Sequence, residues 1–485
     1  MEVLALDLGA SNGRAYRARL RDGNLSFAEM DRFEHAPVSM SGHLYWDFPG
    51  LFARVKQAIQ KAAADARFES LGIDAWGLDF GCLDRNGELL ANPHYHRDAQ
   101  ADGAMKKLLN RMSREEIFDR TGVQFIPANS LYHLYAMKLR RASAVEHAEK
   151  LLMIPDLIRY FLTGQAFTEW TIATTTQMVN IASGVWDEQI AGIVGIPPSI
   201  LCPLVHPGTR LGPLLPQLQE ELALGPAPVV AVGEHDTASA VVAVPAAEQE
   251  FAYISCGTWA LVGTEIARPV VTGEALKDNF TNEGGVGGTY RLLKNVTGLW
   301  LLQRAMRQWG GADRTVTYPA ILAEAAAAGP SRAFVDPDDP RFVNPLSMVD
   351  AVQSFCRERG EPAPEGRGQI ARCILESLAL KFSHVIRQTE RLTGRQFPVI
   401  HLVGGGSRNP LLCQYTANAS GRPVLAGPAE ASAIGNAMVQ YMALGEVGSL
   451  RDMRAIVKRS FPVTVYEAKD DGRWRWATDR LGRLS

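Results

Sequence analysis

The chain has 485 residues and a formal net charge of -2, with 46% hydrophobic and 21% charged residues. This length favours two or three domains, and the composition is that of a soluble globular protein. The small net charge excludes a global basic field for nucleic acid or anionic membranes. No apolar run reaches the length of a membrane span, and the opening MEVLALDLG lacks the regions of a signal peptide. These features predict a cytoplasmic protein with no nucleic-acid or membrane partner.

The cysteine pattern predicts free thiols in a reducing compartment, because no Cys-x-x-Cys pair and no zinc-like spacing is present. A bridge between Cys356 and Cys373 stays open on spacing alone. The six cysteines are Cys82, Cys202, Cys256, Cys356, Cys373 and Cys413.

In chain order, the segment LALDLGASNGRAYRARLRDGNLSFAEMDRF predicts three strands joined by a glycine turn and by an Asp22-Gly23 hairpin turn. An amphipathic helix is expected over 48–65, because Leu51, Val55 and Ile59 share one face. The segment SLGIDAWGLDFGCLD then reads as one further strand. Antiparallel strands followed by a helix and another strand indicate a mixed α/β sheet.

The second half opens with the same element order. FAYISCGTWALVGTEI predicts a strand, a glycine turn and a strand, and a long helix over 370–393 ends at Gly394. PVIHLV, GGGSRNP and LLCQYTANASG then read as a buried strand, a tight turn and a helix. The shared order suggests an old duplication, with the boundary at 244–250. The segment 312–345, rich in Ala, Pro and Asp, is expected to form a helix and loops on the surface.

Two glycine turns at matching places have the form of phosphate-binding turns. In the first, Gly9 and Gly13 allow backbone N–H groups to converge, Ser11 and Asn12 add donors and Arg14 adds positive charge. Asp7, at the end of the strand, could hold Mg²⁺ through water. The second turn, Ser255-Cys256-Gly257-Thr258-Trp259, is an ordinary hairpin if taken alone. Together the two turns are what a phosphate clamp across an interdomain cleft requires.

Two further segments carry candidate chemistry. The run Val403-Gly404-Gly405-Gly406 between a strand and a helix could accommodate a flat ligand such as adenosine, although a plain strand-to-helix turn is the better reading of a lone triple glycine. Asp236, in Gly233-Glu234-His235-Asp236-Thr237, could act as a general base. Capping of the following helix is an equally good reading of Asp236. If Glu234 and Asp236 faced one site, the pKa of one carboxyl would rise.

Aromatic and polar groups typical of sugar sites occur in DAWGLD, over 74–79, and in YHRD, over 95–98. The alternative is core packing for Trp76 and surface exposure for Arg97 and Asp98. The chain has no P-loop, no G-x-G-x-x-G fingerprint and no H-E-x-x-H motif. His94, His133 and His147 show no metal-binding spacing.

Taken in order, the motifs resemble the carbohydrate kinases of the FGGY family, from Asp7 to about Ala437. They are DLGASNGR, GIDAWGLDF, TGVQFIPANSLYHL, ATTTQMVNI, EHDTASAV, SCGTWALVG, TNEGG, LLKNVTGLWLLQR, NPLSM, LVGGGSRN and GPAEASAIGNA. The resemblance implies an α/β fold of two actin-like (ribonuclease H-like) domains with an interdomain cleft. It places a sugar-binding domain over 1–245, a nucleotide-binding domain over 246–445 and a tail over 446–485 that packs on the second domain.

The resemblance also implies an ATP- and Mg²⁺-dependent kinase that phosphorylates the 1-hydroxyl of a ketose, and it is nearest to the L-rhamnulose branch of the family. L-fuculose, D-xylulose and L-ribulose are alternative substrates, and a non-catalytic actin-like ATPase scaffold is a more distant alternative. By resemblance Asp236 is the base, and the sugar-contact positions are Gly77, His235, Asp236, Thr237 and Asn295. The nucleotide positions are Ala10, Ser11, Asn12, Gly13, Arg14, Thr258, Gln303 and Gly405, and Asp7 is the expected magnesium residue.

Four residues depart from the family pattern. Gln100 stands where an arginine is usual, and His96 stands where a tyrosine is common. Glu234 replaces a small residue and Cys256 replaces a serine. Because these positions adjoin the expected sugar or phosphate, they bear on which ketose is used. The oligomeric state stays open.

Overall fold

The computed structural model describes residues 1–246, 250–311, 316–469 and 472–481. The chain divides into two compact units. Unit 1 comprises Met1–Ala247, Glu265–Leu292 and Ala431–Ser460, and unit 2 comprises Glu248–Thr264, Leu293–Glu430 and Phe461–Ser485. Part of the boundary expected over 244–250, namely 247–249, lies outside the described residues. The expected C-terminal tail is divided, because α18 (Leu450–Ser460) belongs to unit 1 whereas β21 (Thr464–Tyr466) and α19 (Arg473–Leu481) belong to unit 2.

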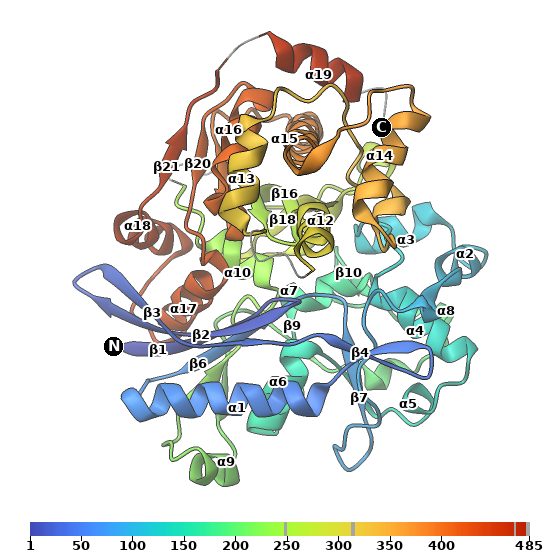
Figure 1. The fold of residues 1–485 in the computed structure, drawn as a ribbon. Helices are drawn as coiled ribbons and strands as arrows, with labels where there is room; N and C mark the ends of the chain where they lie inside the picture. Colours follow the sequence, from blue (N-terminus) through green and yellow to red (C-terminus); the bar gives the residue numbers. More distant parts are fainter. Residues whose placement is uncertain (247–249, 312–315, 470–471, 482–485) are drawn as a thin grey trace. The chain divides into compact units, whose positions relative to one another are not determined.

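The main sheet of unit 1 has the strand order β13-β14-β6-β1-β2-β3, of which Figure 1 labels β6, β1, β2 and β3. Its strands are β1 (Glu2–Leu8), β2 (Asn12–Arg21), β3 (Asn24–Glu34), β6 (Leu71–Ala75), β13 (Arg210–Pro213) and β14 (Pro228–Val230). β1, β2 and β3 pair antiparallel, and β1 pairs parallel with β6. The predicted mixed sheet and both predicted turns are therefore confirmed. Shorter strands of this unit are β4 (Pro37–Met40), β5 (His43–Trp46), β7 (Phe80–Leu83), β8 (Lys150–Met153), β9 (Thr168–Glu169), β10 (Val179–Asn180), β11 (Val185–Trp186), β12 (Leu204–Val205) and β17 (Thr281–Gly284).

The prediction of one continuous strand over 70–84 is wrong. The segment forms β6 and β7, which belong to different sheets and are separated by Trp76–Asp79. The break lies at Leu78, whose φ of 80° is incompatible with a strand. The apolar pattern of the segment continues through the break, so hydrophobicity alone did not reveal it.

Two helices cover opposite faces of the main sheet of unit 1 (Figure 1). α1 (Phe48–Asp65), which has the predicted bounds, shares a core with Leu4, Leu6 and Leu8 of β1. α17 (Ala431–Ala443) packs against β1, β6 and α10 (Asp236–Val242). The other helices of the unit are α2 (Ala104–Leu108), α3 (Arg114–Thr121), α4 (Ser130–Leu139), α5 (Ser143–Glu146), α6 (Ile154–Thr163), α7 (Trp170–Ala173), α8 (Glu188–Val194), α9 (Pro216–Glu221), α11 (Gly273–Lys277) and α18.

In unit 2 the strands follow the order β18-β16-β15-β19-β20-β21. Their bounds are β15 (Ala252–Cys256), β16 (Trp259–Ile266), β18 (Tyr290–Thr297), β19 (Ile400–Val403), β20 (Val424–Ala426) and β21. The helices are α12 (Trp300–Gly310), α13 (Tyr318–Ala327), α14 (Met348–Glu358), α15 (Gly366–Thr393), α16 (Pro410–Ser420) and α19. The long helix predicted to end at Gly394 is confirmed as α15, because Gly394 takes a left-handed conformation directly after it.

Three remaining expectations can be compared with the described residues. The segment 312–345 contains the expected helix α13, but it is not wholly on the surface, because Phe334, Val335 and Phe342 are buried. Its first residues, 312–315, lie outside the described part. The six cysteines are buried free thiols, as predicted, and Cys356 and Cys373 form no bridge. No helix in the described parts of the chain is both long and apolar enough to cross a membrane.

A buried charge network in unit 1 holds the chain just before α10. Arg159 donates from Nε to Glu234 Oε1 (2.9 Å) and from Nη2 to Asp156 Oδ1 (2.6 Å), and all three side chains are at most 1% exposed. Glu169 accepts hydrogen bonds from the Glu234 N–H (3.1 Å) and from the Thr171 hydroxyl (2.6 Å). The Thr171 hydroxyl in turn accepts from the His235 N–H (3.1 Å). Two successive backbone N–H groups are therefore fixed by side chains of a different segment.

The network holds three carboxyl groups and one guanidinium, so its carboxyls are not all neutralised by pairing. Burial, followed by the charge of Glu234, raises the pKa of Glu169 to about 8. Burial also raises the pKa of Asp156, with the charge of Glu234 next in importance. The pKa of Glu234 is raised by burial, and Arg159 opposes that rise. Removing either partner of such a buried pair is far more costly than losing a surface pair.

The close packing of α17 on α10 gives the first prediction. A Cβ atom on Gly435 would lie 1.7 Å from the carbonyl oxygen of Ser239, so Gly435→Ala must push the two helices apart. We expect a loss of about 1–3 kcal/mol in the free energy of unfolding, measured by urea denaturation. Gly192→Ala in α8 is the matched control, because nothing lies within 4 Å of that Cβ. Equal stabilities of the two variants would contradict this account of the packing.

The raised pKa of Glu169 gives a second prediction. Between the ordinary value of 4.5 and about 8, the folded chain retains a proton that the unfolded chain releases. The free energy of unfolding should therefore fall as the pH rises from about 5 to 8. Thermal unfolding at a series of pH values should show this slope in the wild type and in the control Glu149→Gln. In Glu169→Gln the slope should be shallower, and an unchanged slope would refute the assignment.

Candidate active site

Three carboxyl groups gather at one end of the main sheet in unit 1. Asp7 on β1 and Asp74 on β6 are direct partners in the parallel register, and Asp74 is fully buried. Burial raises the pKa of Asp74 well above its ordinary value, and the charges of Asp7 and Asp236 raise it further. A hydrogen bond from Asn436 Nδ2 of α17 (2.7 Å) opposes the rise. Such a set of hard oxygen atoms in mutual repulsion fits a magnesium ion, which takes carboxylate and water ligands.

The first glycine turn follows Asp7 directly. The Gly9 N–H donates to the Asn12 carbonyl (2.9 Å) and closes the turn, and Arg14 Nε donates to Asn12 Oδ1 (2.9 Å). Ser11 is exposed, whereas Ala10, Asn12 and Arg14 are half-buried. Gly13 is required for packing as well, because its Cβ would lie 2.3 Å from the ring of Phe33. Gly9 and Gly13 thus keep the turn tight, as is expected of a phosphate-binding loop.

Asp236 is the first residue of α10, and His235 occupies the N-cap position. The helix-capping reading of Asp236 is therefore wrong. Its carboxylate accepts a hydrogen bond from the Thr237 hydroxyl (3.2 Å). The negative charge of Asp236 also contributes to the raised pKa of Asp74. Glu234, by contrast, points to Arg159, so Glu234 and Asp236 do not share one site. The side chain of Asp236 is 29% exposed and accessible to a ligand.

His235 is held by a buried ion pair. Its Nδ1 lies 3.2 Å from Glu283 Oε2 and 3.2 Å from Arg291 Nη2, and these two residues are 3.1 Å apart. Arg291 is fully buried and also donates from Nε to the Gly284 carbonyl (2.8 Å). His235 Nε2 faces Asp236 Oδ1 at 3.5 Å. The imidazole orientation is thus fixed before any ligand binds.

The expected sugar residues of the first half lie beside this group. Ala75, the last residue of β6, bridges to His235, and Gly77 follows two residues later. A Cβ on Gly77 would lie 3.2 Å from the Thr175 hydroxyl, so a side chain there would be tight. Trp76 is buried, as the alternative of core packing predicted. Asp98 is also buried, at 4% exposure, so the expectation of a solvated Asp98 is wrong.

In unit 2 the second glycine turn and the triple glycine lie together. Thr258 donates from its hydroxyl to Gln303 Oε1 (3.3 Å), and its carbonyl accepts from the Gly298 N–H (3.0 Å). Gly405 has open space where a Cβ would be. Asn295 is half-buried on β18. The structure therefore brings Thr258 to Gln303, a pair that no sequence spacing had indicated.

The departures from the family pattern have local partners. Glu234 pairs with Arg159, His96 Nδ1 lies 3.0 Å from Asp79 Oδ2, and the Gln100 side-chain carbonyl accepts from Arg140. In unit 2, a Cβ on Gly406 would lie 2.6 Å from Cys256 Cβ, so Cys256 packs against the triple glycine. Each of these four residues thus makes a specific contact with a neighbouring residue.

Several residues of the site escaped sequence reasoning. Asp74 was noted only in a sugar motif, and Asn436, Glu283 and Arg291 were given no role. Asn436 lies 362 residues from Asp74 along the chain. Only the motifs TNEGG and GPAEASAIGNA, which contain Glu283 and Asn436, could have drawn attention to them.

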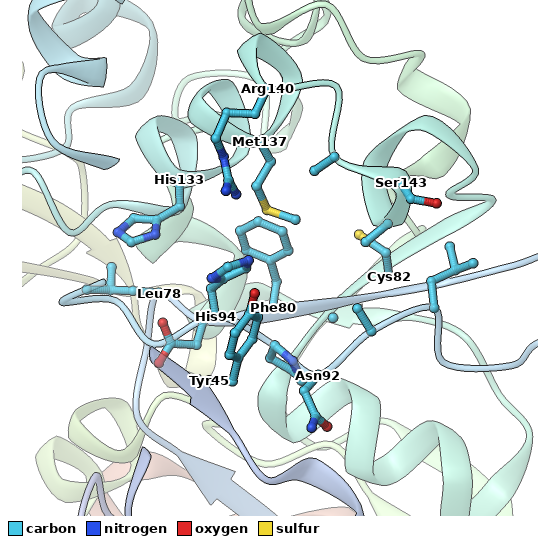
Figure 2. A pocket seen from close by; sticks show the side chains of 17 residues that line it. Tyr45, Leu78, Phe80, Cys82, Asn92, His94, His133, Met137, Arg140 and Ser143 are labelled. Atoms are coloured by element: carbon cyan, nitrogen blue, oxygen red, sulfur yellow. The ribbon is translucent and has the colours of Figure 1, made fainter. Parts of the chain in front are cut away.

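A cavity of about 240 Å³ lies behind the expected sugar loop in unit 1 (Figure 2). Figure 2 shows Arg140, Met137 and His133 entering it from the side of α4, opposite Tyr45, Phe80 and His94. At its edge, donor atoms of His43, His94 and Asp98 lie within 4.8 Å of one another. His43 Nδ1 is 3.1 Å from Asp98 Oδ1 and its Nε2 faces Arg140 at 3.3 Å. With a guanidinium on its second nitrogen, His43 is better described as a hydrogen-bonded residue than as a metal ligand.

The chain matches two family models that together span most of its length. Residues 2–243 match the N-terminal domain of the FGGY family of carbohydrate kinases, and residues 252–444 match its C-terminal domain. A rhamnulokinase of Bacteroides thetaiotaomicron is 43% identical over 97% of this chain and 96% of its own. A rhamnulokinase of an Enterobacter species is 39% identical over 96% of this chain and 94% of its own.

Solved structures show the same fold at low sequence identity. A gluconate kinase from Lactobacillus acidophilus, 17% identical, has a TM-score of 0.82 and covers 100% of this chain and 96% of its own. A glycerol kinase from Plasmodium falciparum with ADP, 14% identical, has a TM-score of 0.79 and covers 100% of this chain and 97% of its own. These likenesses establish the two-domain actin-like fold that the motifs implied. The chain therefore belongs to the FGGY family of carbohydrate kinases, enzymes that take a sugar and ATP as substrates.

Proposed function

We propose that this protein is an L-rhamnulose kinase, which transfers the γ-phosphoryl group of ATP to the 1-hydroxyl of L-rhamnulose. The observation that carries the proposal is the pair of rhamnulokinase relatives, which match nearly the whole chain at 43% and 39% identity. The arrangement of Asp236, His235 and Asp74 in unit 1 supports a phosphoryl-transfer site. His96, Gln100 and Glu234 bear on the choice of ketose, because they depart from the family pattern close to the expected sugar.

Asp236 is proposed as the general base. Its carboxylate is accessible, stands at the start of α10 and lies beside the fixed imidazole of His235. A base so placed can take the proton from the attacking hydroxyl, which contributes about 10²–10⁴-fold in rate. We assign sugar contacts to Gly77, His235, Thr237 and Asn295. We infer that the first half of the chain binds the sugar and the second half binds the nucleotide.

The proposed nucleotide residues are Ala10, Ser11, Asn12, Gly13, Arg14, Thr258, Gln303 and Gly405. In the turn after Asp7, the backbone N–H groups and the Arg14 guanidinium provide hydrogen-bond donors for phosphate oxygens. Asp7 is proposed to hold Mg²⁺, directly or through water, and the adjoining Asp74 supplies further negative charge. The magnesium ion, when bound with ATP, neutralises charge on the phosphates. The protein's own part is to align the hydroxyl with the γ-phosphorus and to exclude water.

A panel of ketoses tests the proposal. L-rhamnulose, L-fuculose, D-xylulose and L-ribulose should be compared in a coupled ADP assay, with a no-sugar control. We expect the highest kcat/KM for L-rhamnulose and little ATP turnover without sugar. A higher kcat/KM for another ketose would assign that substrate instead, and turnover that no sugar stimulates would favour an ATPase scaffold.

The role of Asp236 gives a separate prediction. Asp236→Asn keeps the size of the side chain but removes its basicity, so phosphorylation should fall by about 10²–10⁴-fold. ATP affinity, measured by isothermal titration calorimetry, should stay near that of the wild type. Asp119→Asn in α3 is the matched control and should leave both quantities unchanged. Near-wild-type turnover in Asp236→Asn would disprove the assignment.

A further inference from the structure

The link between β6 and β7 contains a three-residue turn that is strained. The Asp79 N–H donates to the Gly77 carbonyl (3.1 Å), and between them Leu78 has a φ of 80°. A turn closed by an i to i+2 hydrogen bond with positive φ at its centre is rare and unfavourable for a residue with a side chain. Glycine is the residue that adopts such a conformation without cost, yet leucine occupies this position.

The strained turn lies beside the proposed catalytic segment. Ala75, which ends β6, donates from its N–H to the Glu234 carbonyl (2.9 Å) and bridges to His235. Gly77, the proposed sugar contact, is the first residue of the turn. Strain that persists at such a place indicates a functional geometry, because the surroundings must hold it against relaxation.

Packing of the Leu78 side chain does not hold the turn. Leu78 is half-buried and lines the cavity of about 240 Å³ behind the loop (Figure 2). A side chain beside unfilled space can shift if the backbone relaxes. The backbone must therefore be held by other groups.

Hydrogen bonds made by the side chains of Ser130 and Asp79 hold the backbone of the turn. The Ser130 hydroxyl, at the start of α4, donates to the Leu78 carbonyl (2.5 Å). The Asp79 side chain is 3% exposed, and its Oδ2 accepts from Trp46 Nε1 (2.7 Å) and Trp76 Nε1 (2.8 Å). The same oxygen lies 3.0 Å from His96 Nδ1. Because an indole N–H can only donate, both tryptophans depend on this one carboxylate.

The hydrogen bonds also order a group of aromatic rings that includes Trp76, the residue before Gly77. The rings of Trp46 and Trp76 are in contact, with centroids 4.4 Å apart, and His35 stacks on Trp76 at 5.2 Å. Trp46 and Trp76 come from different segments of the chain, and Asp79 joins them from a third position. Loss of the carboxylate would leave two buried N–H groups without an acceptor.

We propose that Asp79 and Ser130 are positioning residues, which hold the Gly77-Leu78-Asp79 turn in its strained form and so orient the Gly77 backbone and the Trp76 ring toward the ketose. The ketose in this statement rests on the proposed function. Neither side chain takes part in phosphoryl transfer. Their effect should appear in sugar binding and should leave ATP binding unchanged.

Thermal unfolding of two variants tests the strain without any substrate. Leu78→Ala and Leu78→Gly both remove the leucine side chain, but only glycine takes a φ of 80° freely. We expect Leu78→Gly to melt at a higher temperature than Leu78→Ala, the reverse of the usual order. Leu139 in α4, exposed and regular, is the control: there the alanine variant should be the more stable. The usual order at Leu78 would overturn the proposal.

Steady-state kinetics tests the positioning role. Ser130→Ala should raise the KM for L-rhamnulose about fivefold to tenfold, as expected for one lost buried hydrogen bond, with the KM for ATP unchanged. Asp79→Leu, which removes the acceptor of both indole N–H groups, should raise the KM for L-rhamnulose at least as much and should also leave the KM for ATP unchanged. Adding Leu78→Gly to Ser130→Ala should recover part of this loss, because a relaxed turn needs less support. Adding Leu78→Ala should not.

The outcomes separate the two proposals. Equal rises in both KM values, or no recovery by Leu78→Gly, would overturn the positioning role while leaving the kinase assignment intact. If the wild type favours another ketose, the same comparison is made with that sugar. If it phosphorylates no ketose, the proposed function fails and the positioning role fails with it, whereas the thermal comparison still decides whether the turn is strained.

Discussion

Mutual repulsion among Asp7, Asp74 and Asp236 is the interaction on which the rest of unit 1 depends. The parallel pairing of β1 and β6 places Asp7 beside Asp74, and α10 begins with the third carboxyl. Burial is the largest cause of the raised pKa of Asp74, and the charges of Asp7 and Asp236 add to it.

The surrounding residues restrict each acidic group to one orientation. Asn436 holds Asp74 from α17, which also packs closely on α10 at Gly435. Behind α10, Glu169 and Thr171 accept hydrogen bonds from the backbone N–H groups of Glu234 and His235, while Glu283 and Arg291 fix the imidazole. Preorganisation of this kind is what lets a kinase stabilise developing charge without rearrangement during the reaction.

Three of the four features that depart from the family pattern lie near the expected sugar, and the fourth, Cys256, packs against the triple glycine of unit 2. His96 contacts Asp79, Gln100 contacts Arg140, and Glu234 has gained Arg159 as a buried partner. The turn after Asp7 keeps the glycines and the arginine that the family pattern leads one to expect.

The sequence by itself determined the hairpins, the helices α1 and α15, the mixed sheet and the family, because glycine turns, helical periodicity and ordered motifs are local signals. It also singled out Asp236 and the turn after Asp7. It could not find the partnership of Asp74 with Asn436, or of His235 with Arg291, because these contacts join segments far apart along the chain. The break at Leu78 was missed for a different reason: the residues on both sides are apolar, and a strained turn leaves no mark in composition. Only the tertiary structure could decide these points, since the contacts that hold a buried charge or a strained backbone are made by side chains from elsewhere in the fold.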